Sequence, residues 1–257
     1  EMASIYAVYH GKAGLEYIAD RIHYKTNALR DALSALGYDT VKEPVFDTVK
    51  ISMSEEEKDK LKRLMLDHKI NLNYFTEGFV SISINETTTT EKIDKVVAAF
   101  AQFKQKQGFK LEPKAVSTLP ENLLRKDEIL KEEVFNKYHT ETELMRYIKR
   151  LERKDLSLTH SMISLGSCTM KLNAATEMIP LSWEYWGAIH PFVPVNQAEG
   201  YQKLIKTLEK DLATITGFAA TSLQPNSGAQ GEYAGLMVIR AYQKSIGQGH
   251  RNICLIP

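Results

Sequence analysis

The chain has 257 residues, which is enough for one large or two modest domains that can bury a core without disulfides or metals. Its 33 Lys and Arg residues nearly balance 32 Asp and Glu residues, so charge does not favour binding to DNA, anionic membranes or polyanionic partners. The two cysteines, Cys168 and Cys254, have no paired ligand spacing, which argues against a disulfide framework or a zinc site and indicates a reducing compartment.

The ends of the chain indicate that it is cut from a longer protein. Residues 3–8 begin an apolar helical pattern with no N-cap before it, and the strand-type run 252–257 stops with no element after it. The first residues lack the basic-then-apolar pattern of a signal peptide, and no apolar run approaches membrane-spanning length. We therefore expect a soluble intracellular protein.

A long amphipathic helix is predicted over residues 3–36, because its apolar residues recur at helical spacing. Gly37 supplies a C-terminal stop. We expect an interruption of this helix near Gly11 and Gly14.

Two strands and two more helices are predicted next. The runs 45–51 and 79–84 alternate sides with β-branched and aromatic residues, as strands do. Helical patterns begin at Ser54 and at Thr90. The first hundred residues therefore predict the order helix, strand, helix, strand, helix.

The middle of the chain predicts a linker that wraps a surface. Gly and Pro residues break the pattern over 106–140, with charged helical turns expected over 125–133. A short helix is predicted over 141–152, and residues 161–173 mix Gly, Ser and Thr with apolar residues as a structured loop does.

The last third of the chain predicts the start of an α/β unit. A helix from Gly200 carries apolar residues on one face and is capped by Gly217. A short apolar segment, 218–223, a small-residue turn, 226–231, and a helix over 233–242 follow.

The turn 226–231 is the best candidate site on chemical grounds. Its small side chains let backbone N–H groups converge at a positive helix end, beside the hydroxyl of Ser227, which is what a phosphate needs. An ordinary helix N-cap has the same residue types. Spacing alone leaves both interpretations open.

The loop 166–171 brings hydroxyls, a thiol and a cation together. Cys168 could act as a nucleophile only if the fold brings His160 or His190 to it, and a buried turn with a small apolar thiol explains the residue as well. Lys171 is a candidate for a covalent cofactor lysine, although a solvated or anion-pairing lysine is the favoured interpretation.

An aromatic cluster spans residues 183–192, with Trp183, Tyr185, Trp186 and Phe192. It could stack on a planar cofactor, but packing at an interface is the favoured interpretation. The other histidines show no metal-ligand spacing, so we expect no metal site.

Three longer motifs stand in chain order: SMISLGSCTMKLN (161–173), HPF (190–192) and SLQPNSGAQGEYAG (222–235). Together they closely resemble the glycine decarboxylase P-protein family. Upstream, the motifs YAVYHG (6–11), FDT (46–48) and SINET (83–87) resemble the end of that family's first half. The resemblance covers nearly the whole chain and is weakest in the linker.

The resemblance implies a parent built from two pseudo-repeated units of the fold-type I, aspartate aminotransferase-like class. The expected fold class is thus α/β, with a small α+β domain, a linker and the start of a large α/β domain. The implied division is 1–106 for the small domain closing the first unit, 107–173 for the linker and active-site loop, and 174–257 for the truncated start of the second large domain.

For the site, the resemblance implies pyridoxal 5'-phosphate in the second unit, with its phosphate at Ser227, Gly228, Ala229 and Gln230. It places the covalent lysine beyond Pro257, so no catalytic residue is assigned within the chain, and Lys171 does not match the lysine motif. Possible active-site walls are Ser167, Cys168, Thr169 and His190. Relatives commonly carry Asn-Leu-Arg where this chain has Asn-Leu-Asn at 71–73, so no arginine role is expected there.

For the activity, the resemblance implies decarboxylation of glycine and transfer of the aminomethyl group to the lipoyl group of H-protein. It implies a dimer of two-unit subunits, in the bacterial cytosol by preference and in the mitochondrial matrix if the source is eukaryotic. The fragment alone is expected to be inactive. The alternatives are a non-catalytic structural or binding piece and a cysteine-dependent enzyme using Cys168.

Overall fold

The computed structural model describes residues 2–106, 119–157, 160 and 174–256. They form two compact units, Glu1–Lys154 and Asp155–Pro257. The first combines helices with a small antiparallel sheet, and the described part of the second is helical and irregular. The chain as a whole is a mixed α and β protein, as expected.

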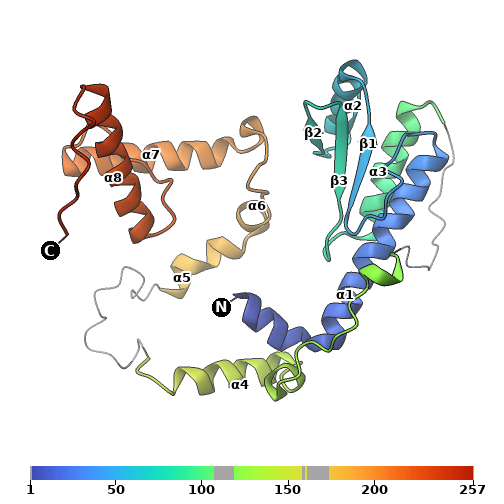
Figure 1. Cartoon of the computed structure of the whole chain (residues 1–257), viewed down its shortest axis with the longest axis horizontal. Helices are drawn as coiled ribbons and strands as arrows, with labels where there is room; N and C mark the ends of the chain where they lie inside the picture. The colour runs from blue at the N-terminus through green and yellow to red at the C-terminus, as the bar shows by residue number, and fades with distance from the viewer. Residues whose placement is uncertain (1, 107–118, 158–159, 161–173, 257) are drawn as a thin grey trace. The chain divides into compact units, whose positions relative to one another are not determined.

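The first unit contains the predicted order of helices and strands, with one strand added (Figure 1). Its elements are α1 (Met2–Ala35), β1 (Thr48–Ser52), α2 (Glu55–Asp67), β2 (Asn73–Phe75), β3 (Phe79–Ser83) and α3 (Thr90–Phe103). The strands pair antiparallel in the order β1-β3-β2. The added strand, β2, has three residues, and Lys58 of α2 donates a hydrogen bond to its Phe75 carbonyl.

Local capping sets the start of both shorter helices. The Ser54 hydroxyl accepts a hydrogen bond from the Glu57 amide at 3.3 Å, and the Glu57 carboxylate accepts one from the Ser54 amide at 3.1 Å. This capping box satisfies two amides that the helix leaves free. Thr89 caps α3 in the same position, so Thr90 is the first helical residue.

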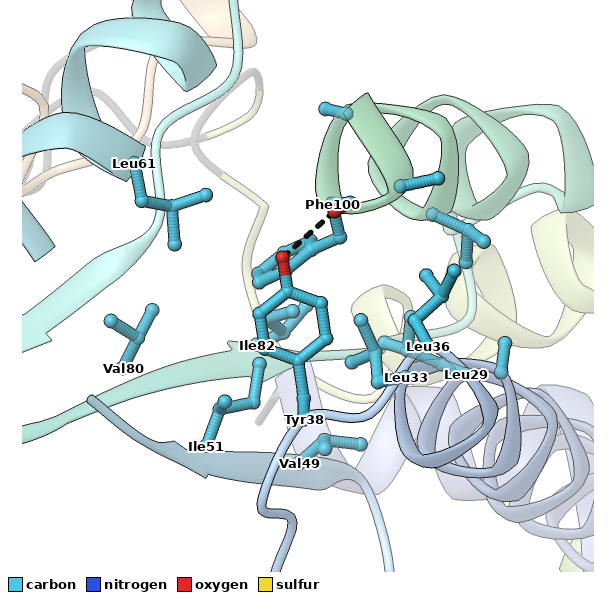
Figure 2. Packing of buried hydrophobic residues seen from close by; sticks show 14 of the residues in the cluster. Leu29, Leu33, Leu36, Tyr38, Val49, Ile51, Leu61, Val80, Ile82 and Phe100 are labelled. Carbon is cyan, nitrogen blue, oxygen red and sulfur yellow. Dashed lines mark hydrogen bonds between the residues drawn. The ribbon is translucent and has the colours of Figure 1, made fainter. Parts of the chain in front are cut away.

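The core lies between one face of the sheet and the helices (Figure 2). Val49 and Ile51 of β1 stand opposite Ile82 and Val80 of β3, so four branched side chains share the covered face. Fully buried Phe100, Leu29, Leu33 and Leu61 from the helices pack with them.

Tyr38 closes the core beside α3. Its ring meets Phe100 edge-on at 5.0 Å between ring centroids, and its hydroxyl donates a hydrogen bond to the Phe100 carbonyl at 2.7 Å. Burial raises the pKa of Tyr38, with a smaller contribution from Glu57. The buried phenol therefore stays neutral and keeps its hydrogen bond.

The long helix α1 is interrupted at Gly11, as predicted, whereas Gly14 keeps helical angles. Gly11 has φ +61° and ψ −173°, a conformation that favours glycine. Gly37, at φ +85°, follows the C-terminal end of the helix.

The rest of the first unit contains two 3₁₀ turns, η1 (Glu121–Leu123) and η2 (Glu133–Asn136), and the helix α4 (Glu141–Glu152). The prediction of α4 is confirmed at both ends. The prediction of charged helical turns over 125–133 is wrong, since residues 125–132 are not helical and η2 begins only at Glu133. The exposed ion pairs of this segment, such as Lys131 with Glu128, are too weak to hold a helix that has no apolar face to bury.

The second unit begins with the short turns α5 (Ala175–Met178), η3 (Ile179–Ser182), α6 (Glu184–Gly187) and η4 (Val195–Gln197). Two helices of equal length follow, α7 (Glu199–Thr216) and α8 (Gly228–Ser245). Gly217 caps α7 at φ +73°, as expected, while α8 starts five residues before its predicted first residue, 233.

No strand occurs in the described residues 174–256, so the strand expected at the C-terminal end is not seen there. The apolar run 252–256 has no neighbouring strand to supply hydrogen bonds. None of the described residues in this range is buried. The apolar faces of α7 and α8 are therefore uncovered in the second unit taken by itself.

Candidate functional site

The turn before α8 is fixed by its own side chains. Ser227, in extended conformation, caps the helix by accepting a hydrogen bond from the Gln230 amide at 3.3 Å. The Gln230 side-chain oxygen in turn accepts a hydrogen bond from the Asn226 amide at 2.8 Å. The Gly231 amide donates to the Ser227 carbonyl at 3.0 Å. These reciprocal bonds hold residues 226–231 in one conformation.

These bonds engage some hydrogen-bond donors of the turn and leave others free to bind an anion. With the rest of the described chain, the amides of Gly228 and Ala229 make no hydrogen bond. Both lie at the positive end of α8, which has 18 residues. The Ser227 hydroxyl can donate while its oxygen still accepts from Gln230.

This donor set fits the phosphate of pyridoxal phosphate. Three donors at a helix start suit the oxygens of a phosphate group, and all four residues 227–230 are exposed to solvent. The backbone amide and the side-chain oxygen of Gln230 are both engaged within the turn. The Gln230 side-chain NH2 group is the donor that this residue can still offer to an anion.

His190 lies in the same unit, on the irregular segment between α6 and η4. Its Nδ1 accepts a hydrogen bond from the Phe192 amide at 3.0 Å, which makes Nε2 the protonated nitrogen of the neutral ring. The rings of His190 and Phe192 are tilted at 5.9 Å between centroids. No contact between His190 and the turn 226–231 is seen in the described part of the chain.

The other predicted wall residues, Ser167, Cys168 and Thr169, lie outside the described residues, as does Lys171. Cys254, the cysteine that is described, is exposed as a free thiol.

The aromatic cluster does not pack as one group. Trp186 meets Tyr201 of α7 at 5.0 Å between centroids, and the Tyr201 hydroxyl donates a hydrogen bond to the Trp186 carbonyl at 2.6 Å. Tyr185 and Phe192 project outward with 86% and 90% of their surfaces exposed. Within the second unit, Trp186 thus anchors its segment to α7, and the outer rings are free to contact a cofactor or another surface.

Among the residues that the structure describes, no group of three His, Cys, Asp or Glu side chains could hold a metal ion. His68 pairs with Gln102 at 2.8 Å, and His139 contacts the Tyr9 carbonyl. None of the described helices has the length and apolar character needed to span a bilayer.

Several known proteins that are similar to this chain carry the same name. Residues 1–100 match the family described as glycine cleavage system P-protein. The chain is 59% identical over 257 residues to the glycine dehydrogenase (decarboxylating) of Christiangramia forsetii and 52% identical to that of Flavobacterium johnsoniae. The protein of the same name from Nostoc sp. is 49% identical over 262 residues. Each alignment covers 100% of this chain and 27% of the relative, so the chain spans about a quarter of the length of these curated relatives.

Proposed function

We propose that this chain belongs to the glycine cleavage system P-protein family and is part of a pyridoxal-phosphate-dependent glycine decarboxylase. The enzyme decarboxylates glycine and passes the aminomethyl group to the lipoyl group of H-protein. The identity to curated glycine dehydrogenases over the whole chain supports the activity. The single structural observation that carries the proposal is the set of three free donors at the start of α8.

In this proposal the chain supplies the phosphate site. The amides of Gly228 and Ala229 and the hydroxyl of Ser227 bind the phosphate, while Gln230 holds the turn by its bond to the Asn226 amide. Bound pyridoxal phosphate supplies an electron-withdrawing ring that stabilises negative charge on the carbon that loses carbon dioxide.

The residues that line the site are proposed from the resemblance to the P-protein family and from the hydrogen bond between His190 and Phe192. Ser167, Cys168 and Thr169 would line it from the loop 161–173. His190 would present its Nε2–H, because Nδ1 is already engaged by the Phe192 amide. A ring held in one tautomer can donate a hydrogen bond to the cofactor or the substrate without a change of protonation.

We further propose a fold-type I parent with the division 1–106, 107–173 and 174–257. The uncovered apolar faces of α7 and α8 support this division, because the large domain of such an enzyme places helices against a sheet. A dimer of two-unit subunits in the bacterial cytosol, or in the mitochondrial matrix of a eukaryote, completes the proposal.

The covalent lysine is proposed to lie after Pro257, which leads to a direct test. The 257-residue polypeptide, incubated with pyridoxal phosphate and reduced with borohydride, should show no stoichiometric adduct at any single lysine by peptide mass spectrometry. It should also release no carbon dioxide from glycine. A Lys171→Arg variant serves as the control, since an adduct at one lysine that disappears in this variant would assign the covalent role to Lys171 and contradict the proposal.

A further inference from the structure

The interruption of α1 is filled by a segment from far along the chain. The 3₁₀ turn η2 and the residues after it pack against α1 at Gly11, within the first unit. A Cβ atom added to Gly11 would lie 2.6 Å from the Phe135 carbonyl oxygen and 2.7 Å from Cε1 of His139. Residues 132–139, called the strap below, therefore fit against α1 only because residue 11 has no side chain.

The strap also replaces a hydrogen bond that the helix loses. A residue with the angles of Gly11 breaks the i to i−4 ladder, and carbonyl groups of the preceding turn lose their amide partners. His139 Nδ1 lies 2.8 Å from the carbonyl oxygen of Tyr9. Because a carbonyl oxygen can only accept, Nδ1 carries the proton and donates it.

The arm of α1 before the interruption, residues 2–10, reaches a second distant segment. The Tyr6 hydroxyl donates a hydrogen bond to the Glu86 carboxylate at 3.3 Å. The rings of Tyr6 and His10 pack at 4.3 Å between centroids. The arm thus meets the loop before α3 through one polar contact at the protein surface.

That loop is held firmly, so it is the fixed side of the contact. The Asn85 side-chain oxygen accepts hydrogen bonds from the Thr87 amide at 3.0 Å and from the Thr88 hydroxyl at 3.0 Å. Lys25, which is buried, donates a hydrogen bond to the Thr88 carbonyl. Whether Tyr6 meets Glu86 therefore depends on the direction of the arm, which bends at Gly11 and is also held by buried Val8.

We propose that the strap is a positioning device: His139 holds the Tyr9 carbonyl so that the arm 2–10 places Tyr6 against Glu86. Release of the strap frees the arm and breaks the contact between Tyr6 and Glu86, while the core of the first unit is unchanged. The device joins two of the motifs in the sequence, YAVYHG (6–11) and SINET (83–87), through a segment that belongs to neither.

The ionisation of Tyr6 reports the contact. Partial burial raises the pKa of Tyr6, and the charge and hydrogen bond of Glu86 raise it further. In the 257-residue chain labelled with ¹³C at the tyrosine ring, the Tyr6 signal is assigned with Tyr6→Phe and titrated by NMR. Glu86→Gln should lower the pKa of Tyr6, and His139→Ala should lower it by at least as much.

Two further variants of His139 distinguish a specific role in positioning the arm from a general loss of structure. The amide nitrogen of Asn mimics Nδ1, so His139→Asn should restore much of the pKa elevation. Gln places its amide where Nε2 lies, so His139→Gln should restore less. A pKa of Tyr6 unchanged from wild type in folded His139→Ala would overturn the proposal, as would equal values in the Asn and Gln variants. If His139→Ala does not fold, the comparison of His139→Asn with His139→Gln decides by itself.

Discussion

Replacement of Phe100 by alanine should lower the free energy of unfolding of the first unit by about 3–5 kcal/mol. Phe100 is fully buried, and its ring packs edge-on against Tyr38 in the cluster of Figure 2. The alanine variant keeps the carbonyl that accepts the Tyr38 hydrogen bond, so the loss comes from the missing ring and the cavity it leaves.

Urea unfolding followed by backbone hydrogen exchange measures this loss. Exchange of the amides of β1 and β3 reports the first unit, whereas both tryptophans, Trp183 and Trp186, lie in the second unit and serve as a separate fluorescence probe. Phe46→Ala is the matched control, because Phe46 is 45% exposed. Its replacement should lower the free energy of unfolding by less than about 1.5 kcal/mol. Equal losses for the two variants would show that Phe100 is not in the core of the unit.

Limited proteolysis should cut the second unit about ten-fold faster than the first in the 257-residue polypeptide, since sites without buried contacts open at low free energy. The second unit has no buried residue over 174–256. Its helices expose large apolar side chains, such as Ile215 at 79% and Val238 at 68%. Such a surface also predicts association between molecules through residues 218–257.

The comparison can be made between matched sites within one chain. Lys95 of α3 and Lys203 of α7 are both exposed lysines on long helices, but α3 is anchored by the core cluster and α7 is not. Trypsin followed by mass spectrometry should find cleavage at Lys203 well before cleavage at Lys95. Early cleavage throughout 1–106 with residues 218–256 spared would contradict this expectation.

Where signals are local, the sequence predicts the fold well. Capping residues such as Ser54 and Thr140 mark helix starts, and glycines such as Gly37 and Gly217 follow helix ends, because these residues act on the nearest backbone groups. The sequence does not predict the three-residue strand β2, because its pairing depends on β3 and on Lys58 of α2.

For the candidate site and the strap too, the sequence predicts local features but not contacts between distant residues. The turn 226–231 could be recognised from small residues before a helix, but the bond between Gln230 and the Asn226 amide depends on side-chain conformation. The contact of His139 with the Tyr9 carbonyl joins residues 130 positions apart, and no periodicity or spacing encodes it. The walls proposed for the loop 161–173 rest on resemblance to the family.

The proposed phosphate site is tested most directly by the affinity for pyridoxal phosphate of a polypeptide that spans the length of the curated relatives. Ser227→Ala should raise the Kd for pyridoxal phosphate about ten-fold, which corresponds to about 1.4 kcal/mol, and should leave the Kd for pyridoxal, which has no phosphate, nearly unchanged. Ser222→Ala is the matched control, since Ser222 accepts a hydrogen bond from the Gln224 amide outside the turn. A Kd for pyridoxal phosphate equal to that of the wild type in Ser227→Ala, or an equal loss for both ligands, would contradict a phosphate site at the start of α8.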